Sequence, residues 1–439
     1  MPKQNLPGST SASRLDWLFR HWLAVLFWVG ALIALAAMAH FGAVGWDAQG
    51  YWKAAQSVHR GSDPYAEDLA ALRRFHERLA TNPSEPRPFV YVYSPMTLPL
   101  LRLLAIFPGW LVGLLYGAAV AAGAAIQLWA GFQMADQRER GWLMLALPAV
   151  VFFPGLVTDD VMLSGNVAYL IYGAILIGAT AGWTRGRWTW FYFAVLLASV
   201  IKTPFLVFLA LPVLVDARQW IRAGVTAVAG VLIFAAQALL WPELYREYLS
   251  SLLLVFDWLH DFGFGPASVL GLYLWRRGLP TATATTILFL VCAVVTGVVL
   301  LVLARRVRKW NLPGEAWVPV ALVGTALLNP RVMKYDLAAI TVPMLLIGVR
   351  ALRLWWSAGG SSTGAGTNRA RRAVIVAGAS LFFLIPNVIT AVGPSWFPAE
   401  FLVLIVIFVL GLWSLGECSS SNGLRGSELS WREGLAGTE

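Results

Sequence analysis

The sequence has few charged residues and almost no cysteine. Charged side chains make up 13% of its 439 residues, and only two residues are cysteines. Cys292 lies inside an apolar run and Cys418 in a polar tail, which argues against a disulfide or a metal–thiolate site. The formal net charge of +10 would suggest a nucleic-acid partner in a soluble protein. Here many basic residues stand in short loops between apolar runs, so orientation in a membrane explains them better and no nucleic-acid partner is predicted.

Long hydrophobic runs dominate what the sequence does contain. Hydrophobic residues account for 58% of the chain, and the mean hydropathy is +0.67. A helix needs about 20 apolar residues to cross a bilayer, so these runs predict an all-α polytopic membrane protein with about twelve transmembrane helices. The first run is long for a signal peptide and is predicted to stay as an uncleaved helix. The runs cover residues 22–41, 109–134, 141–157, 166–182, 187–201, 203–215, 221–241, 281–304, 315–328, 337–356, 373–391 and 399–415.

An apolar run at 92–107 is interrupted, and whether it crosses the membrane decides the orientation of all later helices and loops. It contains Pro95 and Pro99 and carries Arg102. If it crossed the membrane, the basic loops before and after it would face opposite sides. The positive-inside rule therefore favours a re-entrant or interfacial segment, with both termini in the cytoplasm. The basic residues that then share the cytoplasmic side are Lys3, Arg14, Arg20, Arg138, Arg140, Arg185, Arg187, Arg218, Arg222, Arg305, Arg306, Arg308, Lys309, Arg350, Arg353, Arg369, Arg371 and Arg372.

Polar segments divide the chain into regions. The first outer loop, 42–91, contains two amphipathic patterns, which predict helices lying flat at the membrane interface. Asp63 would cap the second of these helices and Pro64 would begin it. The expected regions are a main transmembrane region at 1–356, with a second outer loop and candidate lid at 242–280, a cytoplasmic linker at 357–372, a C-terminal transmembrane hairpin at 373–416 and a disordered cytoplasmic tail at 417–439.

Asp47 is the polar residue around which the chain is organised. It follows the first apolar run, at the point where a helix beginning near Trp22 leaves the hydrocarbon core after about 20 residues. A carboxylate at that boundary can cap a helix that begins at Ala48, or it can act as a general base that faces a cavity. The two roles are compatible, since a capping carboxylate retains lone pairs.

Cations interrupt the apolar pattern near the same predicted membrane face. Lys202 precedes Pro204, so the short runs on either side can form a hairpin with Lys202 at its outer end. Its ammonium would either snorkel to the interface or bind a phosphate. A second group stands in a polar turn, where Asp336 can cap the next helix. There Arg331 would hold phosphate oxygens bidentately and Lys334 would add a point charge, if the turn is more than a solvated connection.

Other polar residues near this face are weaker candidates. Asp159 and Asp160 fit a solvated loop as well as a site, and Asn166 follows them in the sequence. A carboxylate together with cations suits transfer of a group from a lipid phosphate, because the base takes a hydroxyl proton while the cations hold the departing phosphate. No metal site is predicted, because ligand spacing is absent among His59, His76 and His260.

Five short motifs occur in the order typical of one enzyme family. With them the chain resembles glycosyltransferase family 87, whose members have the GT-C fold and resemble α-1,2-mannosyltransferases that use polyprenyl-phosphate-mannose. The resemblance covers about residues 20–350. The motifs are DAQGYWKAA at 47–55, GSDPY at 61–65, YVYSPM at 91–96, KTP at 202–204, and NP at 329–330 followed by KY at 334–335.

The resemblance implies roles for particular residues. Asp47 would be the general base in the first outer loop, and Lys202 would lie beside the lipid phosphate. The chain departs from the family at Asn166, where Gly-Gln followed by Asn is common, and at Lys334-Tyr335, where a His-Tyr pair is usual. The second departure leaves the cation geometry and the donor sugar open. The implied donor phosphate-binding residues are Lys202, Arg331 and Lys334, and the candidate substrate-binding residues are Tyr51, Tyr93, Asp160, Asn166, Tyr335 and Asp336.

The residues and the resemblance together predict a glycosyltransferase of the bacterial inner membrane with a GT-C-like helical bundle and an active site on the outer face. It would move a sugar, with mannose expected, from a polyprenyl-phosphate donor to an extracytoplasmic glycan or glycolipid by inverting displacement. No cofactor is expected, because the lipid-linked sugar is itself the donor; membrane lipid is a further partner. The rivals are a transporter or lipid flippase, for which an inverted repeat around a midplane site is typical, and a non-catalytic scaffold.

Overall fold

The computed structural model describes a protein whose regular elements are helices. It describes residues 46–79, 82, 88, 90–136, 139–140, 143, 165–259, 266–279, 281–329, 336–337, 340–358 and 402–417. This part of the chain contains no strand, which confirms the prediction of an all-α protein. Its helices are α2 (Trp46–His59), α3 (Pro64–Leu79), η1 (Pro95–Thr97), α4 (Leu98–Leu104), α5 (Gly109–Met134), α8 (Ala168–Arg185), α9 (Thr189–Ile201), η2 (Thr203–Leu209), α10 (Ala210–Val215), η3 (Ala217–Gln219), α11 (Trp220–Leu240), α12 (Pro242–Leu259), α13 (Pro266–Arg276), α14 (Ala282–Trp310), α15 (Gly314–Ala326), α16 (Thr341–Ala358) and the helix Leu402–Glu417, where η denotes a 3₁₀ helix.

Two helical stretches in the described residues are long and apolar enough to cross a membrane. They are Ala217–Leu240 and Thr283–Trp310, and a bent pair of helices at the start of α5 would make a third crossing if it counts as one span. Along α14 the side chains of Ile287, Leu290 and Val294 are more than half exposed, which suits contact with lipid. The predicted bundle of about twelve spans stays a prediction, because the runs 22–41 and 373–391 lie outside the described residues.

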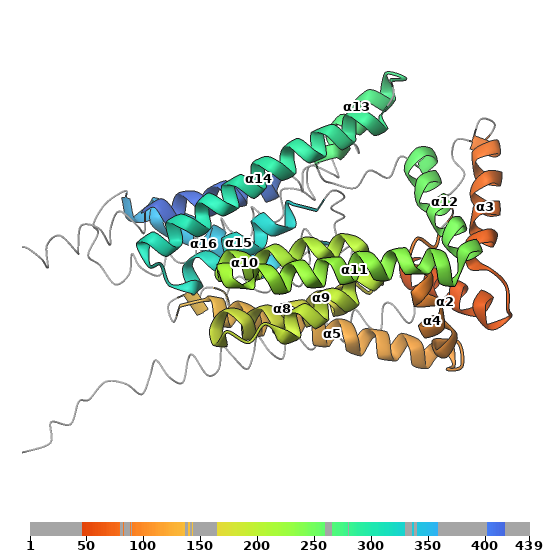
Figure 1. Cartoon of the computed structure of the whole chain (residues 1–439), viewed down its shortest axis with the longest axis horizontal. Coiled ribbons are helices and arrows are strands. Elements are labelled where there is room, and N and C mark those ends of the chain that lie inside the picture. Colours follow the sequence, from red (N-terminus) through yellow and green to blue (C-terminus); the bar gives the residue numbers. More distant parts are fainter. Residues whose placement is uncertain are drawn as a thin grey trace, which may run out of the picture.

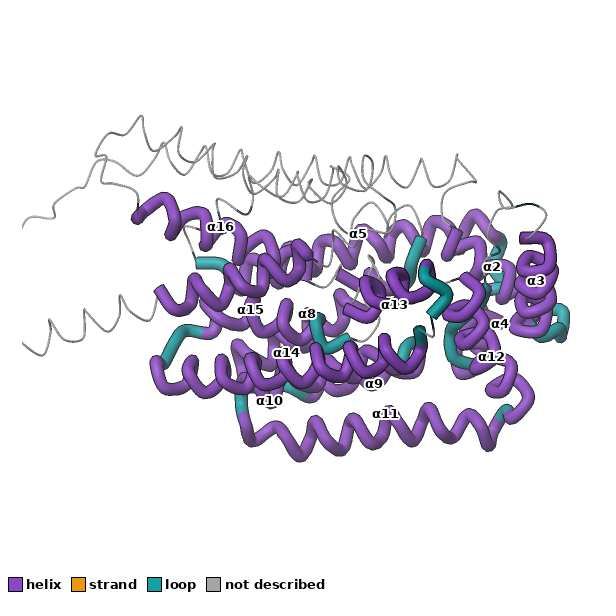
Figure 2. Tube along the Cα trace, turned by 90° about the horizontal axis from the view of Figure 1, so that it is seen from above, coloured by secondary structure: helices purple, strands orange, loops and turns teal. Residues whose placement is uncertain are grey.

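Four helices gather at one end of the bundle. Figures 1 and 2 both place α2, α3, α4 and α12 there, while α16 lies toward the other end. α2 packs against α4, and α12 packs against α3. In Figure 1, α3 runs across the long direction that α11 and α14 follow. A helix across the end of an apolar bundle has the orientation expected of an interfacial helix, as predicted for the loop at 42–91.

The turn between α2 and α3 has the structure that its sequence predicts. Gly61 has φ 79°, a left-handed conformation that glycine adopts without a steric penalty. Oδ1 of Asp63 accepts a hydrogen bond from the backbone N–H of Tyr65 at 2.8 Å and so caps α3. Pro64 is the first residue of that helix, where its missing N–H costs nothing.

The segment 92–107 does not form a continuous helix. Residues 91–94 are irregular, η1 and α4 follow from Pro95 to Leu104, and the chain then bends by 117° into α5. α4 has seven residues, a length of about 10 Å, whereas the hydrocarbon core is about 30 Å thick. α4 alone is therefore too short to cross a bilayer. The depth of this segment in the membrane stays a prediction.

The antiparallel hairpin of α8 and α9 sets the positions of Asn166 and Lys202. The two helices pack so closely that a Cβ added to Gly178 would lie 2.6 Å from the Cα of Phe191. Asn166 stands two residues before α8, and Lys202 directly follows α9. Because the helices run in opposite directions, the start of α8 and the end of α9 come to the same end of the bundle.

The opposite end of the bundle collects several basic turns. Gly314 at the start of α15 lies against the ring of Trp183 near the end of α8, and Tyr192 near the start of α9 contacts Gln219 before α11. Arg350 of α16 donates to two backbone carbonyls in the first turn of α15. We call this region the basic end. Its basic residues are Arg185, Arg187, Arg218, Arg222, Arg305, Arg306, Arg308, Lys309, Arg350 and Arg353.

Candidate functional site

Asp47 lies in the first turn of α2 and is half-buried. α2 begins at Trp46, so Asp47 is a helical residue and not the cap of a helix that begins at Ala48, as the sequence suggested. Oδ2 of Asp47 accepts a hydrogen bond from Nδ2 of Asn166 at 2.6 Å. A hydrogen bond to an ionised carboxylate is shorter and stronger than one between neutral groups, so this contact fixes the direction of the carboxylate.

Asn166 is held so that its amide nitrogen points at Asp47. Its Oδ1 accepts a hydrogen bond from the backbone N–H of Ala168 at 2.9 Å, which leaves Nδ2 to face the carboxylate. The backbone carbonyl of Asn166 accepts a second hydrogen bond from the Tyr116 hydroxyl at 2.7 Å. Only 1% of the residue is exposed. The orientation of the amide is therefore set by partners on α5 and α8 rather than by solvent.

Two tyrosine hydroxyls extend this network. Tyr51 lies one turn after Asp47 on α2 and therefore on the same face. Its hydroxyl oxygen is 2.6 Å from that of Tyr93, and Nδ2 of Asn166 makes a longer contact of 3.4 Å with the Tyr93 hydroxyl. Burial and the nearby Asp47 charge raise the pKa of Tyr93 above its ordinary value. The phenol therefore stays protonated and can donate a hydrogen bond.

Lys202 supplies a cation beside the same tyrosine. Its Nζ lies 5.5 Å from the centroid of the Tyr93 ring, within the range of a cation–π interaction. Nζ is also 3.9 Å from Oδ1 of Asp336, and the side chain of Lys202 is 21% exposed. Asp336 is buried and accepts a hydrogen bond from the Tyr172 hydroxyl at 2.9 Å. The ammonium is thus largely removed from water but not fully buried.

The structure brings six of the predicted site residues together. They come from four separate parts of the helical bundle and from the residues between α15 and α16. Of the other predicted residues, Asp160, Arg331, Lys334 and Tyr335 lie outside the described residues, as does Asp159. We call the connected set the Asp47–Lys202 cluster; its members are Asp47, Tyr51, Tyr93, Asn166, Lys202 and Asp336.

Three polar residues that were not predicted from the sequence form hydrogen bonds with members of the cluster or with a residue next to one of them. Tyr116 binds Asn166, and Tyr172 binds Asp336. Both lie in apolar helices, and tyrosine is common in membrane helices near the interface. Their positions in the sequence therefore did not mark them as residues of a site. Gln237 accepts a hydrogen bond from Ser94, the neighbour of Tyr93. Gln237 could have been identified from the sequence, because an amide buried in an apolar helix such as α11 costs free energy unless it has a hydrogen-bond partner.

The cluster contains the groups needed for acid–base chemistry next to an anion. Asp47 can accept a proton, the tyrosine hydroxyls can donate hydrogen bonds, and Lys202 can stabilise negative charge. Among the described residues, no three His, Cys, Asp or Glu side chains lie close enough together to hold a metal ion. The expectation that the site works without a cofactor stays a prediction.

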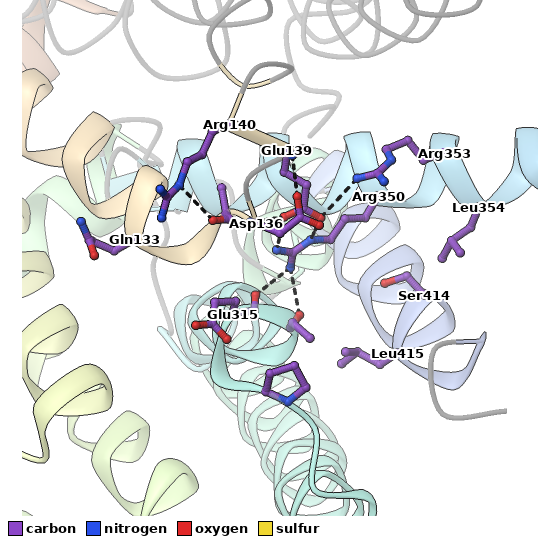
Figure 3. Close-up of a pocket in the computed structure, with 13 residues that line it drawn as sticks. Gln133, Asp136, Glu139, Arg140, Glu315, Arg350, Arg353, Leu354, Ser414 and Leu415 are labelled. Atoms are coloured by element: carbon purple, nitrogen blue, oxygen red, sulfur yellow. Dashed lines mark hydrogen bonds and ion pairs between the residues drawn. The ribbon is translucent and has the colours of Figure 1, made fainter. Parts of the chain in front are cut away.

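A pocket of about 560 Å³ lies at the basic end of the bundle (Figure 3). Within it Arg350 binds both carboxylate oxygens of Glu139, through Nε at 2.6 Å and Nη2 at 2.7 Å. Its remaining N–H groups donate to the backbone carbonyls of Met134, Glu315 and Ala316. A guanidinium has five N–H donors, and all five are used by Glu139 and by backbone carbonyls of α5 and α15. This arrangement is a structural clamp rather than an anion site.

Comparison with known proteins supports one family. The sequence model of glycosyltransferase family 87 matches residues 91–330, just over half of the chain. The matched segment contains Tyr93, Asn166 and Lys202, whereas Asp47 and Asp336 lie outside it. No curated protein and no solved structure matches the chain. In the structure, Asp47 joins the matched segment through its hydrogen bond with Asn166.

Proposed function

The chain belongs to glycosyltransferase family 87 and is a membrane glycosyltransferase, and we propose that it transfers a sugar from polyprenyl phosphate to a hydroxyl group of a glycan or glycolipid. The sugar in this proposal is mannose. Asp47 takes the proton of the acceptor hydroxyl, whose oxygen forms a bond to the anomeric carbon. The bond between that carbon and the phosphate oxygen breaks, and its electron pair leaves with polyprenyl phosphate. This direct displacement inverts the anomeric carbon, so a β-linked donor gives an α-linked product.

The contacts of Asp47 suit a general base. The hydrogen bond from Asn166 reaches Oδ2 of Asp47 at 2.6 Å and orients the carboxylate, as a general base requires. Because Asn166 is itself held by Ala168 and Tyr116, the carboxylate keeps a constant direction. Positioned general bases contribute rate factors of about 10² to 10⁴. A base that is oriented before the acceptor arrives loses little of that factor to reorganisation.

Lys202 suits the stabilisation of the departing phosphate. Negative charge on the phosphate oxygen grows as the bond to the sugar breaks, so a fixed cation stabilises the transition state more than the bound donor. An ammonium group has three N–H donors and can bind a phosphate oxygen while it stays near Asp336. In this proposal Arg331 and Lys334 join Lys202 at the phosphate.

The observation that carries the proposal is the position of Tyr93 between the base and the cation. Nδ2 of Asn166 contacts both Asp47 and the Tyr93 hydroxyl, while Nζ of Lys202 lies over the ring of Tyr93. One tyrosine side chain therefore separates the carboxylate from the ammonium. In this proposal the donor phosphate lies near Lys202, and the acceptor hydroxyl lies between Asp47 and the anomeric carbon, on the side opposite the departing phosphate.

We assign the site to the outer face of a bacterial inner membrane, with both termini in the cytoplasm. The basic end lies opposite the helices α2, α3 and α4, which stand at the cluster's end of the bundle (Figure 1). Short loops rich in Lys and Arg are retained in the cytoplasm. The charge distribution therefore supports a cytoplasmic basic end and an Asp47–Lys202 cluster that faces outward.

Replacement of Asp47 by Asn tests the proposal. Purified protein in nanodiscs is incubated with labelled polyprenyl-phosphate-mannose and a membrane glycolipid fraction, and free polyprenyl phosphate and labelled product are measured. We expect Asp47→Asn to lose activity by at least about 100-fold, while Glu77→Gln, a change at an exposed carboxylate of α3, keeps it. Full activity of Asp47→Asn would refute the assignment of the base. A transporter or flippase would move the lipid without releasing polyprenyl phosphate.

A further inference from the structure

Gln237 lies at the centre of a second set of contacts that fixes Tyr93. We propose that Gln237 is a positioning residue: its amide oxygen holds the turn at residues 94–96 and thereby sets the place of the Tyr93 side chain in the Asp47–Lys202 cluster. Its effect on catalysis rests on the proposed function. Its effect on the turn rests on the structure alone, so the two can be tested separately.

The position of Gln237 on α11 directs its side chain into the protein. The buried residues of α11 are Ala223, Gly230 and Gln237, spaced by seven residues. Seven residues make about two helical turns, so the three share one face. Gly230 on this face lies against Leu206 and Ser199, and Gln237 is only 1% exposed. An amide buried this deeply requires hydrogen-bond partners.

Gln237 supplies a cap that the turn lacks. Its Oε1 accepts hydrogen bonds from the Ser94 hydroxyl at 2.6 Å and from the backbone N–H of Met96 at 3.3 Å. Ser94 stands at the N-cap position of η1 but makes no side-chain cap hydrogen bond to that helix. The first residues of a helix have N–H groups without helical partners, which a cap side chain usually satisfies. Gln237 performs this task from another helix.

The irregular segment that carries Tyr93 is therefore fixed from two sides. On the side of α3, Oδ2 of Asp68 accepts from the backbone N–H of Tyr91 at 2.8 Å, and the Tyr65 hydroxyl donates to the backbone carbonyl of Tyr93 at 2.5 Å. On the side of α11, Gln237 holds the residues that follow. A segment without helix or strand partners depends on such contacts for its backbone polar groups. Tyr93 lies between the two points of attachment.

Removal of the amide oxygen would release one of these attachments. The turn could then shift, and with it the Tyr93 hydroxyl near Asn166 and the ring under Lys202. A misplacement of about 1 Å can cost on the order of 100-fold in rate when a group must be held in a productive geometry. Gln237 itself contacts none of the cluster residues through the hydrogen bonds described, so it acts through Tyr93.

The first test compares Gln237→Leu, which removes the acceptor, with Gln237→Glu, which keeps an acceptor oxygen of similar reach. We expect Gln237→Leu to lower kcat about ten- to 100-fold with a smaller change in the KM for labelled polyprenyl-phosphate-mannose, and Gln237→Glu to restore most of kcat. Leu239→Ala, on the exposed face of α11 (86% exposed), serves as the control. Wild-type kcat in Gln237→Leu would overturn the proposal, as would equal losses in the Leu and Glu variants.

The second test does not depend on activity. Hydrogen exchange of the peptide that covers residues 91–98 is measured for the same full-length variants in nanodiscs. Faster exchange in Gln237→Leu, with protection kept in Gln237→Glu and Leu239→Ala, would support the proposal, whereas unchanged exchange in Gln237→Leu would overturn it. If the wild-type protein releases no polyprenyl phosphate, the proposed function fails while the exchange result still decides the role of Gln237.

Discussion

Substitution of Lys202 by Met tests the charge balance of the Asp47–Lys202 cluster. Nζ of Lys202 lies 3.9 Å from Oδ1 of Asp336, and two unit charges at that distance interact by about 4 kcal/mol at an effective dielectric constant of about 20. A phosphate at a similar distance from Lys202 would gain a comparable attraction. Lys202→Met removes that attraction and leaves the Asp336 carboxylate facing the anion. Each 1.36 kcal/mol is a factor of ten, so we expect kcat/KM to fall by about 10² to 10³.

The double variant Lys202→Met/Asp336→Asn separates the two parts of this loss. Asn at position 336 keeps an oxygen that can accept from the Tyr172 hydroxyl but carries no charge. Because repulsion from Asp336 contributes to the defect of Lys202→Met, the double variant should be more active than Lys202→Met alone. Coupling energies between neighbouring residues are about 0.5–3 kcal/mol, so the expected recovery is about two- to 100-fold.

Initial rates of polyprenyl phosphate release in nanodiscs, measured over a range of donor concentrations, give kcat and KM for the wild type, both single variants and the double variant. Lys202→Arg, which keeps a cation, should retain more activity than Lys202→Met. Thermal unfolding of each protein identifies losses that come from misfolding. If the effects of the two single substitutions simply multiply in the double variant, Lys202 and Asp336 do not act on a common charge and the reasoning is refuted.

Two further predictions concern the outer helices and the basic end. Hydrogen bonding to Asp63, burial and the Asp63 charge raise the pKa of Glu247 from 4.5 to about 7. The folded protein therefore keeps a proton that the unfolded chain loses, so the free energy of unfolding should fall as the pH rises toward 7 and then level off. Glu247→Gln should remove most of this pH dependence from the unfolding temperature measured between pH 5 and 8. An unchanged slope in the variant would contradict this. Glu139→Gln breaks the clamp with Arg350, both mostly buried, and should destabilise the fold by about 3 kcal/mol or more. Scanning fluorimetry measures this as a lower unfolding temperature, and no shift would show that the clamp adds little.

The sequence predicted helices and turns well where a local physical signal marks them. Gly61 and the Asp63-Pro64 pair mark the turn before α3, and the prolines at 95 and 99 mark a segment that the structure divides into η1 and α4. The start of α2 was predicted two residues late, because a carboxylate fits both an N-cap and a first helical turn. The assigned end of a helix commonly varies by about one or two residues where no capping hydrogen bond defines it.

The site was harder to predict because its contacts join distant parts of the chain. Asp47 and Asn166 are separated by 119 residues, and Asp336 binds a tyrosine 164 residues away. Apolar runs place polar residues at a common membrane face, but they do not say which side chains touch. The hydrogen bond from Asn166 to Asp47 also depends on Tyr116, which orients Asn166 from within an apolar helix. No spacing rule singles out such a tyrosine from others in membrane helices.

The Asp47–Lys202 cluster joins two parts of the protein that are positioned by different forces. Asp47 belongs to α2, which is tied to α3 by the ion pair of Lys53 with Asp68 at 2.7 Å and by the hydrogen bond from Ser57 to Glu67 at 2.8 Å. Lys202 belongs to the apolar bundle, where close packing of α8 on α9 fixes it.

Tyr93 connects these two parts, since its hydroxyl contacts the α2 side and its ring lies under Lys202. Apolar burial is roughly proportional to area and has no preferred direction, so packing alone would hold the two parts together without aligning the carboxylate and the ammonium. Hydrogen bonds depend on distance and angle. The alignment of base and cation therefore rests on the polar contacts of the short segment that carries Tyr93, and this explains why side chains of α3 and α11 bind its backbone on both sides.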